Sequence, residues 1–115
     1  MPASEEEKEF VAYVADLMQS IGPVRAKRMF GGHGIFLDDL MFGLVADSVL
    51  YLKADQTSAK DFEARGLEAF SYHKQGKLFK MSYYQAPEET LEDAEEMTHW
   101  AKQAFVVALQ AAARK

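Results

Sequence analysis

The chain has 115 residues, a net charge of -5 and no cysteine, and its length is typical of one domain. The absence of cysteine excludes a disulfide scaffold, thiolate zinc sites and a cysteine nucleophile. The acidic start does not resemble a signal peptide, and the longest apolar run, residues 40–46, is far shorter than the roughly 20 residues that span a membrane. We therefore expect one cytoplasmic domain over residues 1–115, with no membrane partner.

The charge is unevenly distributed along the chain. Both ends are acidic, whereas residues 22–85 are mildly basic. An acidic protein repels nucleic acid at long range. The composition therefore predicts that the chain does not bind DNA tightly.

Helical spacing of apolar residues predicts a first helix over residues 5–20. A capping box formed by Ser4 and Glu7 marks its start, and Gly22-Pro23 ends it. Residues 24–30 follow, either as a first strand or as an irregular segment.

Three successive strands are expected next, over residues 35–37, 40–46 and 49–54. The pairs Asp38-Asp39 and Asp47-Ser48 supply the turns between them. Connections this short join antiparallel strands, so the three strands form a meander.

The second half of the chain begins with a short helix over residues 56–65, which ends at Gly66. Two strands, residues 70–74 and 77–84, are joined at Gln75-Gly76 and form a hairpin.

A last helix begins near a capping-box pattern formed by Asp93 and Glu96. Its apolar stripe, which includes Trp100 as a core residue, runs to the end of the chain. Strands that lie between helices predict an α+β domain. We expect an antiparallel sheet of five to six strands, with the N-terminal, middle and C-terminal helices packed on it.

A glycine-rich segment is the leading candidate for a ligand site. Clustered glycines let backbone N–H groups approach a phosphate, and two arginines lie just upstream. However, the Walker and dinucleotide patterns are incomplete, and the glycines precede a strand rather than a helix. The favoured interpretation is a turn or bulge with positive φ. The alternative is a small-ligand or anion site formed by Arg25, Arg28, Gly31, Gly32, His33 and Gly34.

The residues of common catalytic and metal sites are scattered. His33, His73 and His99 are isolated in the sequence, and no cysteine is available to complete a metal site. Ser82 does not lie in a nucleophile-elbow pattern. No nucleophile, base and orienting group are found together, so we predict no catalytic residue, no metal site, no cofactor and no enzymatic activity.

Lysines alternate with aromatic residues on the late hairpin. Such a pattern is found in proteins that bind single-stranded nucleic acid by stacking. Aromatic residues are also favoured in strands, and lysines protect exposed sheet edges, so the structural interpretation is preferred. The residues concerned are Tyr72, Lys74, Lys77, Phe79, Lys80 and Tyr83.

The strand expected at residues 40–46 is apolar on both faces, with Met41 and Phe42 pointing to opposite sides. Either helices cover both faces of the sheet, or one face is covered by a partner or a second copy. Met41 and Phe42 are therefore both candidates for an interface, and the interface of a homodimer is the simplest one.

Several separated motifs together resemble the N-terminal domain of the TfoX/Sxy family. The likeness covers roughly residues 10–110 and lies in residues 22–24, 28–36, 40–42, 50–53 and 81–84, with Pro87. The resemblance implies an α+β fold and a co-regulator of transcription in natural competence that acts with the cyclic-AMP receptor protein. It implies no catalytic residue.

Full-length members of that family carry a second, C-terminal domain with a helix-hairpin-helix appearance, whereas this chain stops at Lys115. We therefore expect a stand-alone N-terminal domain that acts as a non-enzymatic interaction module, related to regulators of transcription or competence. Its expected partner is a protein or a second copy of the chain. The alternative function is the small-ligand or anion-binding domain described above.

Overall fold

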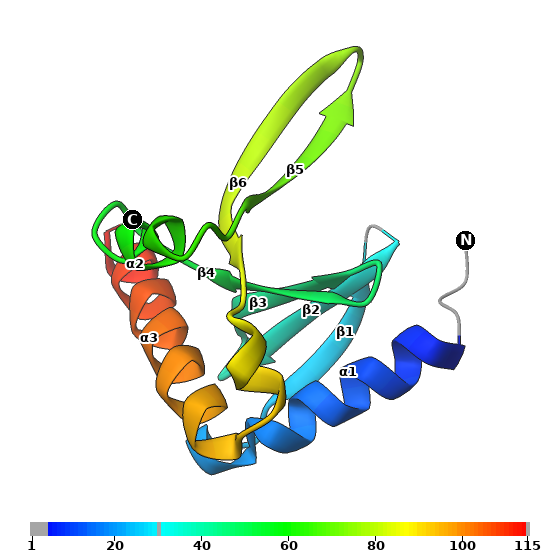
Figure 1. Ribbon diagram of the computed structural model, residues 1–115, viewed down its shortest axis with the longest axis vertical. Coiled ribbons are helices and arrows are strands. Elements are labelled where there is room, and N and C mark those ends of the chain that lie inside the picture. The colour runs from blue at the N-terminus through cyan, green and yellow to red at the C-terminus, as the bar shows by residue number, and fades with distance from the viewer. Residues whose placement is uncertain (1–4, 30, 115) are drawn as a thin grey trace.

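A computed structural model describes residues 5–29 and 31–114, and Figure 1 shows its sheet flanked by helices. All six strands are antiparallel and follow the order β1-β2-β3-β4-β6-β5. The predicted α+β fold is confirmed. The elements are α1 (Glu5–Leu17), η1 (Gln19–Ile21), β1 (Arg25–Met29), β2 (Gly32–Leu37), β3 (Leu40–Ala46), β4 (Val49–Lys53), α2 (Ala59–Ala64), β5 (Ala69–Lys74), β6 (Lys77–Gln85), η2 (Glu88–Leu91) and α3 (Ala94–Ala113).

Tight turns with positive φ at both central residues connect β2 to β3, β3 to β4 and β5 to β6, at the three residue pairs where turns were predicted. Asp38 and Asp39 have φ values of 51° and 63°, and the pairs Asp47-Ser48 and Gln75-Gly76 behave alike. This left-handed geometry matches the twist of antiparallel strands, and Asp, Asn and Gly tolerate it best.

The helix boundaries differ from the prediction at the end of α1, which stops at Leu17 rather than at residue 20, and at the start of α2. α2 begins three residues late because Asp55 and Ser58 form a reciprocal turn, in which the Ser58 amide donates to Asp55 Oδ1 at 2.7 Å. These hydrogen bonds, led by the one from Ser58, hold the pKa of Asp55 below its usual value. At α3, Asp93 caps the helix by accepting from the Glu95 amide. Ser4, the predicted cap of α1, lies outside the described residues.

The hydrophobic core lies between one face of the sheet and the three helices (Figure 1). α3 contributes Trp100, as predicted, and its ring packs against Phe62 of α2. Other fully buried core residues are Val14, Met18, Ile35, Phe42, Val45, Leu52, Met97 and Ala101. No helix among the described residues is long and apolar enough to cross a lipid bilayer.

A bulge in β3 decides which side chains reach this core. Ile35 pairs with Gly43, but its neighbour Phe36 pairs with Met41, so Phe42 is the extra residue. Phe42 is fully buried and packs edge-on against Phe105 of α3, with ring centroids 5.8 Å apart. The prediction that Phe42 is an interface residue is therefore wrong, because α3 covers it. Met41 lies on the opposite face.

Candidate functional site

One face of the sheet is left uncovered by the described helices, which all contribute to the core on the other face (Figure 1). Strand register places a continuous set of large apolar side chains on this side, and we call it the open face. Its members are Met29, Phe36, Met41, Leu44, Tyr51, Phe70, Tyr72, Phe79 and Tyr83.

Methionines form the part of the open face that lies over β1–β3. They can approach one another because Gly34 has no side chain: a Cβ there would lie 2.6 Å from Met29 Sδ and 3.3 Å from Met41 Sδ. The same Cβ would also meet the ring of Phe36 at 2.8 Å. Gly34 thus lets two flexible methionines and one aromatic ring close over the strand.

A row of aromatic rings extends the open face onto the hairpin of β5 and β6. Tyr51 meets Phe70 edge-on at 5.1 Å between ring centroids, and Phe70 stacks on Tyr72 at 6.3 Å. Tyr72 then stacks on Phe79, its cross-strand partner, at 5.6 Å. The last two side chains are 41% and 42% exposed. The hairpin, which projects away from the helices in Figure 1, thus presents two large apolar side chains to solvent.

Tyr83 lies between the methionines and the aromatic row. Its hydroxyl donates to the Met41 carbonyl at 3.4 Å, and Lys53 Nζ lies 5.0 Å from the centre of its ring. Burial raises the pKa of Tyr83 to about 12. The pKa of Tyr51 is also raised, by burial first and then by nearby carboxylates. The ring of Tyr83 is itself largely shielded from water, since this residue is only 6% exposed.

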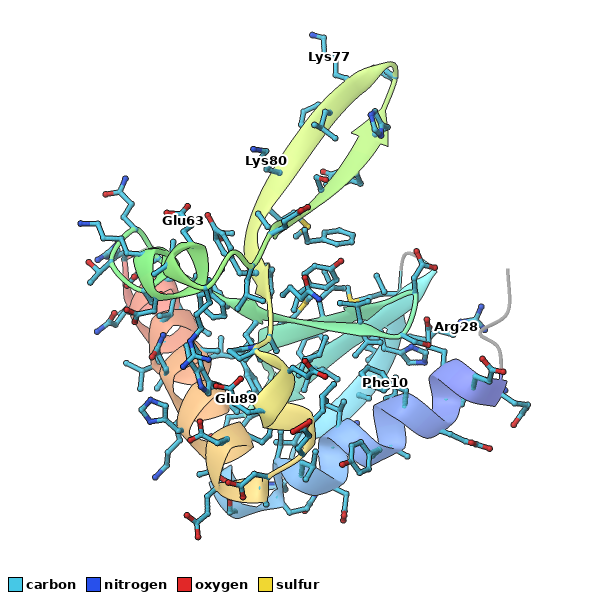
Figure 2. All side chains as sticks on the ribbon, viewed as in Figure 1. Phe10, Arg28, Glu63, Lys77, Lys80 and Glu89 are labelled. Atoms are coloured by element: carbon cyan, nitrogen blue, oxygen red, sulfur yellow. The ribbon has the colours of Figure 1, made fainter. Side chains whose placement is uncertain are left out.

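Positive charge accompanies these apolar side chains. Although the chain has 18 acidic and 13 basic residues, none of the six described strands contains Asp or Glu. Strand register places five cations on the side of the open face: Arg25, Lys27, Lys53, Lys74 and Lys77. Figure 2 shows Lys77 extending from the tip of the hairpin. The two carboxylates that raise the pKa of Tyr51, Asp47 and Glu68, lie outside the strands, in the β3–β4 turn and just before β5.

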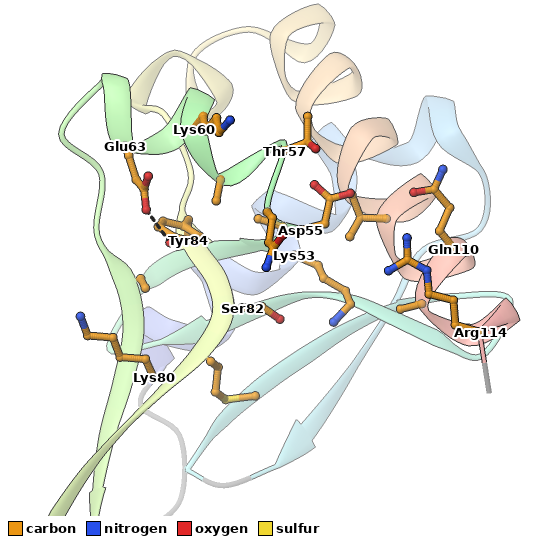
Figure 3. Close-up of a pocket in the computed structure, with 17 residues that line it drawn as sticks. Lys53, Asp55, Thr57, Lys60, Glu63, Lys80, Ser82, Tyr84, Gln110 and Arg114 are labelled. Carbon is orange, nitrogen blue, oxygen red and sulfur yellow. Dashed lines mark hydrogen bonds between the residues drawn. The ribbon is translucent and has the colours of Figure 1, made fainter.

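An open cleft of about 800 Å³ lies between α2, β6 and the last turns of α3 and shares Lys53 with the open face (Figure 3). Within it, the Tyr84 hydroxyl donates to Glu63 Oε2 at 3.0 Å, and this hydrogen bond raises the pKa of Tyr84. Ser82 lines the cleft, but none of the described residues that line it is a histidine, so no imidazole base is found beside Ser82 in this part of the chain. The cleft also holds the cations Lys53, Lys60, Lys80 and Arg114.

Comparison with known proteins places this arrangement in a family. The model of the TfoX N-terminal domain matches residues 16–108, which include the whole sheet and most of α3. The chain belongs to this family.

Two relatives show how far the similarity extends. DNA transformation protein TfoX1 of Aliivibrio fischeri (strain ATCC 700601 / ES114) is 32% identical over 73 residues, which make up 64% of this chain and 35% of that protein. Protein Sxy of Escherichia coli (strain K12) is 24% identical over 95 residues, or 83% of this chain and 46% of that protein. The chain thus spans less than half of the length of these relatives.

Within this TfoX N-terminal domain, the glycine-rich segment forms a turn and a strand. Gly31 has a φ of 77° in the turn, as the favoured interpretation predicted, and β2 already begins at Gly32. Gly32 is buried, and a Cβ on it would lie 2.3 Å from the Val45 carbonyl oxygen. Close packing of two strands thus accounts for this glycine.

The other residues of the predicted anion site do not converge. Arg25 pairs with Phe36 and Arg28 with His33, so the two arginines, three residues apart on β1, point to opposite faces of the sheet. His33 is buried and directs Nδ1 toward Glu7. This geometry does not favour one anion bound jointly by both arginines.

Instead, His33 belongs to a buried polar contact that the sequence analysis missed. Glu7 Oε2 lies 3.1 Å from His33 Nδ1, and Glu7 Oε1 accepts from the Ser48 amide at 3.3 Å. The carboxylate thereby ties the first turn of α1 to the start of β2 and to the β3–β4 turn. Glu7 was expected only as part of a helix cap, and its distance of 26 residues from His33 gave no signal of the contact.

We expect Glu7→Ala to lower the free energy of unfolding by about 1–3 kcal/mol, because it leaves His33 and the Ser48 amide without this carboxylate in a buried site. Urea denaturation followed by circular dichroism measures the change. Glu6→Ala is the matched control, since Glu6 is exposed in the same turn. Equal stability of the two variants would contradict the assigned role of Glu7.

Proposed function

We propose that this chain is a non-enzymatic interaction module that acts in the cytoplasm and regulates transcription or competence by binding a protein partner through the open face. Family membership supports the regulatory part, since its relatives include a DNA transformation protein and Sxy. The open face supports the interaction part, and it is the observation on which the proposal depends.

The open face has the composition of an interface. Aromatic residues, methionine and arginine are enriched at protein interfaces, and a large exposed apolar patch on a monomer is commonly functional. Tyr72 and Phe79 project such rings into solvent. A protein partner or a second copy that buried on the order of 800 Å² per side would form a stable contact.

The experiment is a transcript profile in the organism that carries the chain. We expect Phe79→Ser to reproduce most of the profile of a gene deletion, because it removes an exposed ring of the open face. Leu78→Ser is the matched control: Leu78 is 54% exposed and lies next in the sequence, on the other side of the hairpin. An unchanged profile in the deletion strain would disprove a regulatory function, and equal effects of the two variants would disprove the role of the open face.

A second expectation concerns duplex DNA. We expect only weak, salt-sensitive association, because the net charge of -5 opposes approach to the phosphates. A gel-shift titration at physiological salt measures this affinity. Submicromolar binding of a duplex would contradict the proposal that the partner is a protein.

A further inference from the structure

The geometry points to a specific chemistry for the partner: we propose that the open face binds an acidic polypeptide segment that carries large apolar or aromatic side chains. This inference rests on the proposed function and deepens it. An acidic, apolar polypeptide segment fits the face better than a second copy of the chain or single-stranded nucleic acid does.

The apolar residues of the open face, which we call its floor, favour a partner that carries apolar side chains. Met29 and Met41 are flexible and polarizable, so they adapt to apolar groups of different shapes. Tyr72 and Phe79 already stack on each other and stay more than 40% exposed, which makes them anchors for a further apolar side chain.

The cations at the two ends of this floor, which we call its rims, favour a partner that carries acidic side chains. Arg25 and Lys27 lie on β1, and Lys74 and Lys77 lie at the tip of the hairpin, so cations flank the apolar residues at the β1 edge of the sheet and at the hairpin tip. Since the described strands contain no carboxylate, nothing on the strands neutralises them. Carboxylates at the two ends of a bound segment would meet these cations.

A second copy fits the rims poorly. In a twofold dimer, the same surface patch is present on both subunits. Two open faces placed together would set cations against cations across a desolvated contact, and like charges across an interface oppose association. The apolar floor favours such a dimer, but the charges oppose it.

Single-stranded nucleic acid fits the floor poorly. Bases stack well on Tyr72 and Phe79, but the part of the face over β1–β3 is built from methionines around Gly34, which suit aliphatic groups better than bases. A nucleic acid also brings one phosphate per nucleotide toward a chain of net charge -5. A polypeptide segment needs only a few carboxylates at its ends.

The size of the face sets the length of the segment. The face extends about 19 Å across the strands from β1 to β6, and a further ~20 Å along β6 from Tyr83 to Lys77 at the hairpin tip, so about twelve extended residues cover it. The probe is therefore a fluorescent peptide of about twelve residues, with leucine and phenylalanine at its centre and glutamate at both ends. Two further peptides keep the centre and carry serine or lysine in place of glutamate.

The experiment measures fluorescence anisotropy with the full 115-residue chain. We expect the glutamate peptide to bind at least tenfold more tightly than the serine peptide, and the lysine peptide to bind more weakly still. Phe79→Ser should weaken binding of the glutamate peptide tenfold or more, whereas Leu78→Ser should leave it unchanged. Lys74→Ser combined with Lys77→Ser should weaken it at least threefold and reduce its salt dependence, without removing any apolar side chain.

Three outcomes would overturn the inference. Equal binding of the glutamate and serine peptides would disprove the role of the rims. Tighter binding of an oligothymidylate, weakened by the same variants, would make the face a platform for nucleic acid. A dimer in sedimentation equilibrium that Met41→Lys abolishes would make the occupant a second copy.

The transcript profile separates the failure of this inference from the failure of the proposed function. If Phe79→Ser still reproduces the deletion profile while the glutamate peptide does not bind, the interaction module stands and the acidic chemistry is wrong. If the peptide binds as expected but neither Phe79→Ser nor the deletion changes the profile, the regulatory function is wrong and the binding chemistry stands.

Discussion

Gly32→Ala should destabilise the fold by about 3 kcal/mol or more. A Cβ at this position would lie 2.3 Å from the carbonyl oxygen of Val45, a backbone atom of β3 that cannot rotate out of the way. The β2–β3 pairing at the centre of the fold must therefore open to admit one methyl group, and overpacking of this kind costs a large share of a marginal stability. Urea denaturation followed by circular dichroism gives the change in the free energy of unfolding.

The neighbouring glycine provides the control. Gly31 also needs its backbone freedom, with a φ of 77°, but a Cβ there meets nothing within 4 Å. Gly31→Ala should cost only about 1 kcal/mol, which is the strain of a left-handed alanine. If the two variants lost the same stability, close approach of the strands would not be the reason for Gly32.

Local chemistry explains which parts of the fold could be predicted from the sequence. The pairs Asp38-Asp39 and Gln75-Gly76 adopt the turn conformation that their residue types favour, and that conformation depends on few distant contacts. The start of β2 could not be predicted, because glycine disfavours strands. Gly32 and Gly34 are held in the strand by neighbours that are distant in the sequence, such as Val45.

The open face could not be predicted in full either, because it too depends on residues that are distant in the sequence. Alternation of lysines with aromatic residues marked the hairpin as unusual, and the apolar strand β3 indicated that one sheet face needs a cover. The sequence could not show that Lys27 on β1 shares a face with Lys74 on β5, since this depends on the order and register of all six strands. Nor could it locate the bulge that separates Met41 from Phe42.

The bulge in β3 places two adjacent apolar residues in different environments, Phe42 in the core and Met41 on the open face. We expect Phe42→Ala to lower the free energy of unfolding by about 3–5 kcal/mol, because it empties a fully buried site against Phe105 and the surrounding core can collapse only partly. Met41→Ala removes a side chain that is only partly buried on the open face, so it should cost less than half as much. Urea denaturation midpoints measure the difference, provided that the unfolding free energy of the two variants depends on urea concentration with the same slope. Since the two residues are adjacent and both apolar, equal losses would mean that the open face is packed as tightly as the core. The open face would then have little surface left to offer a partner.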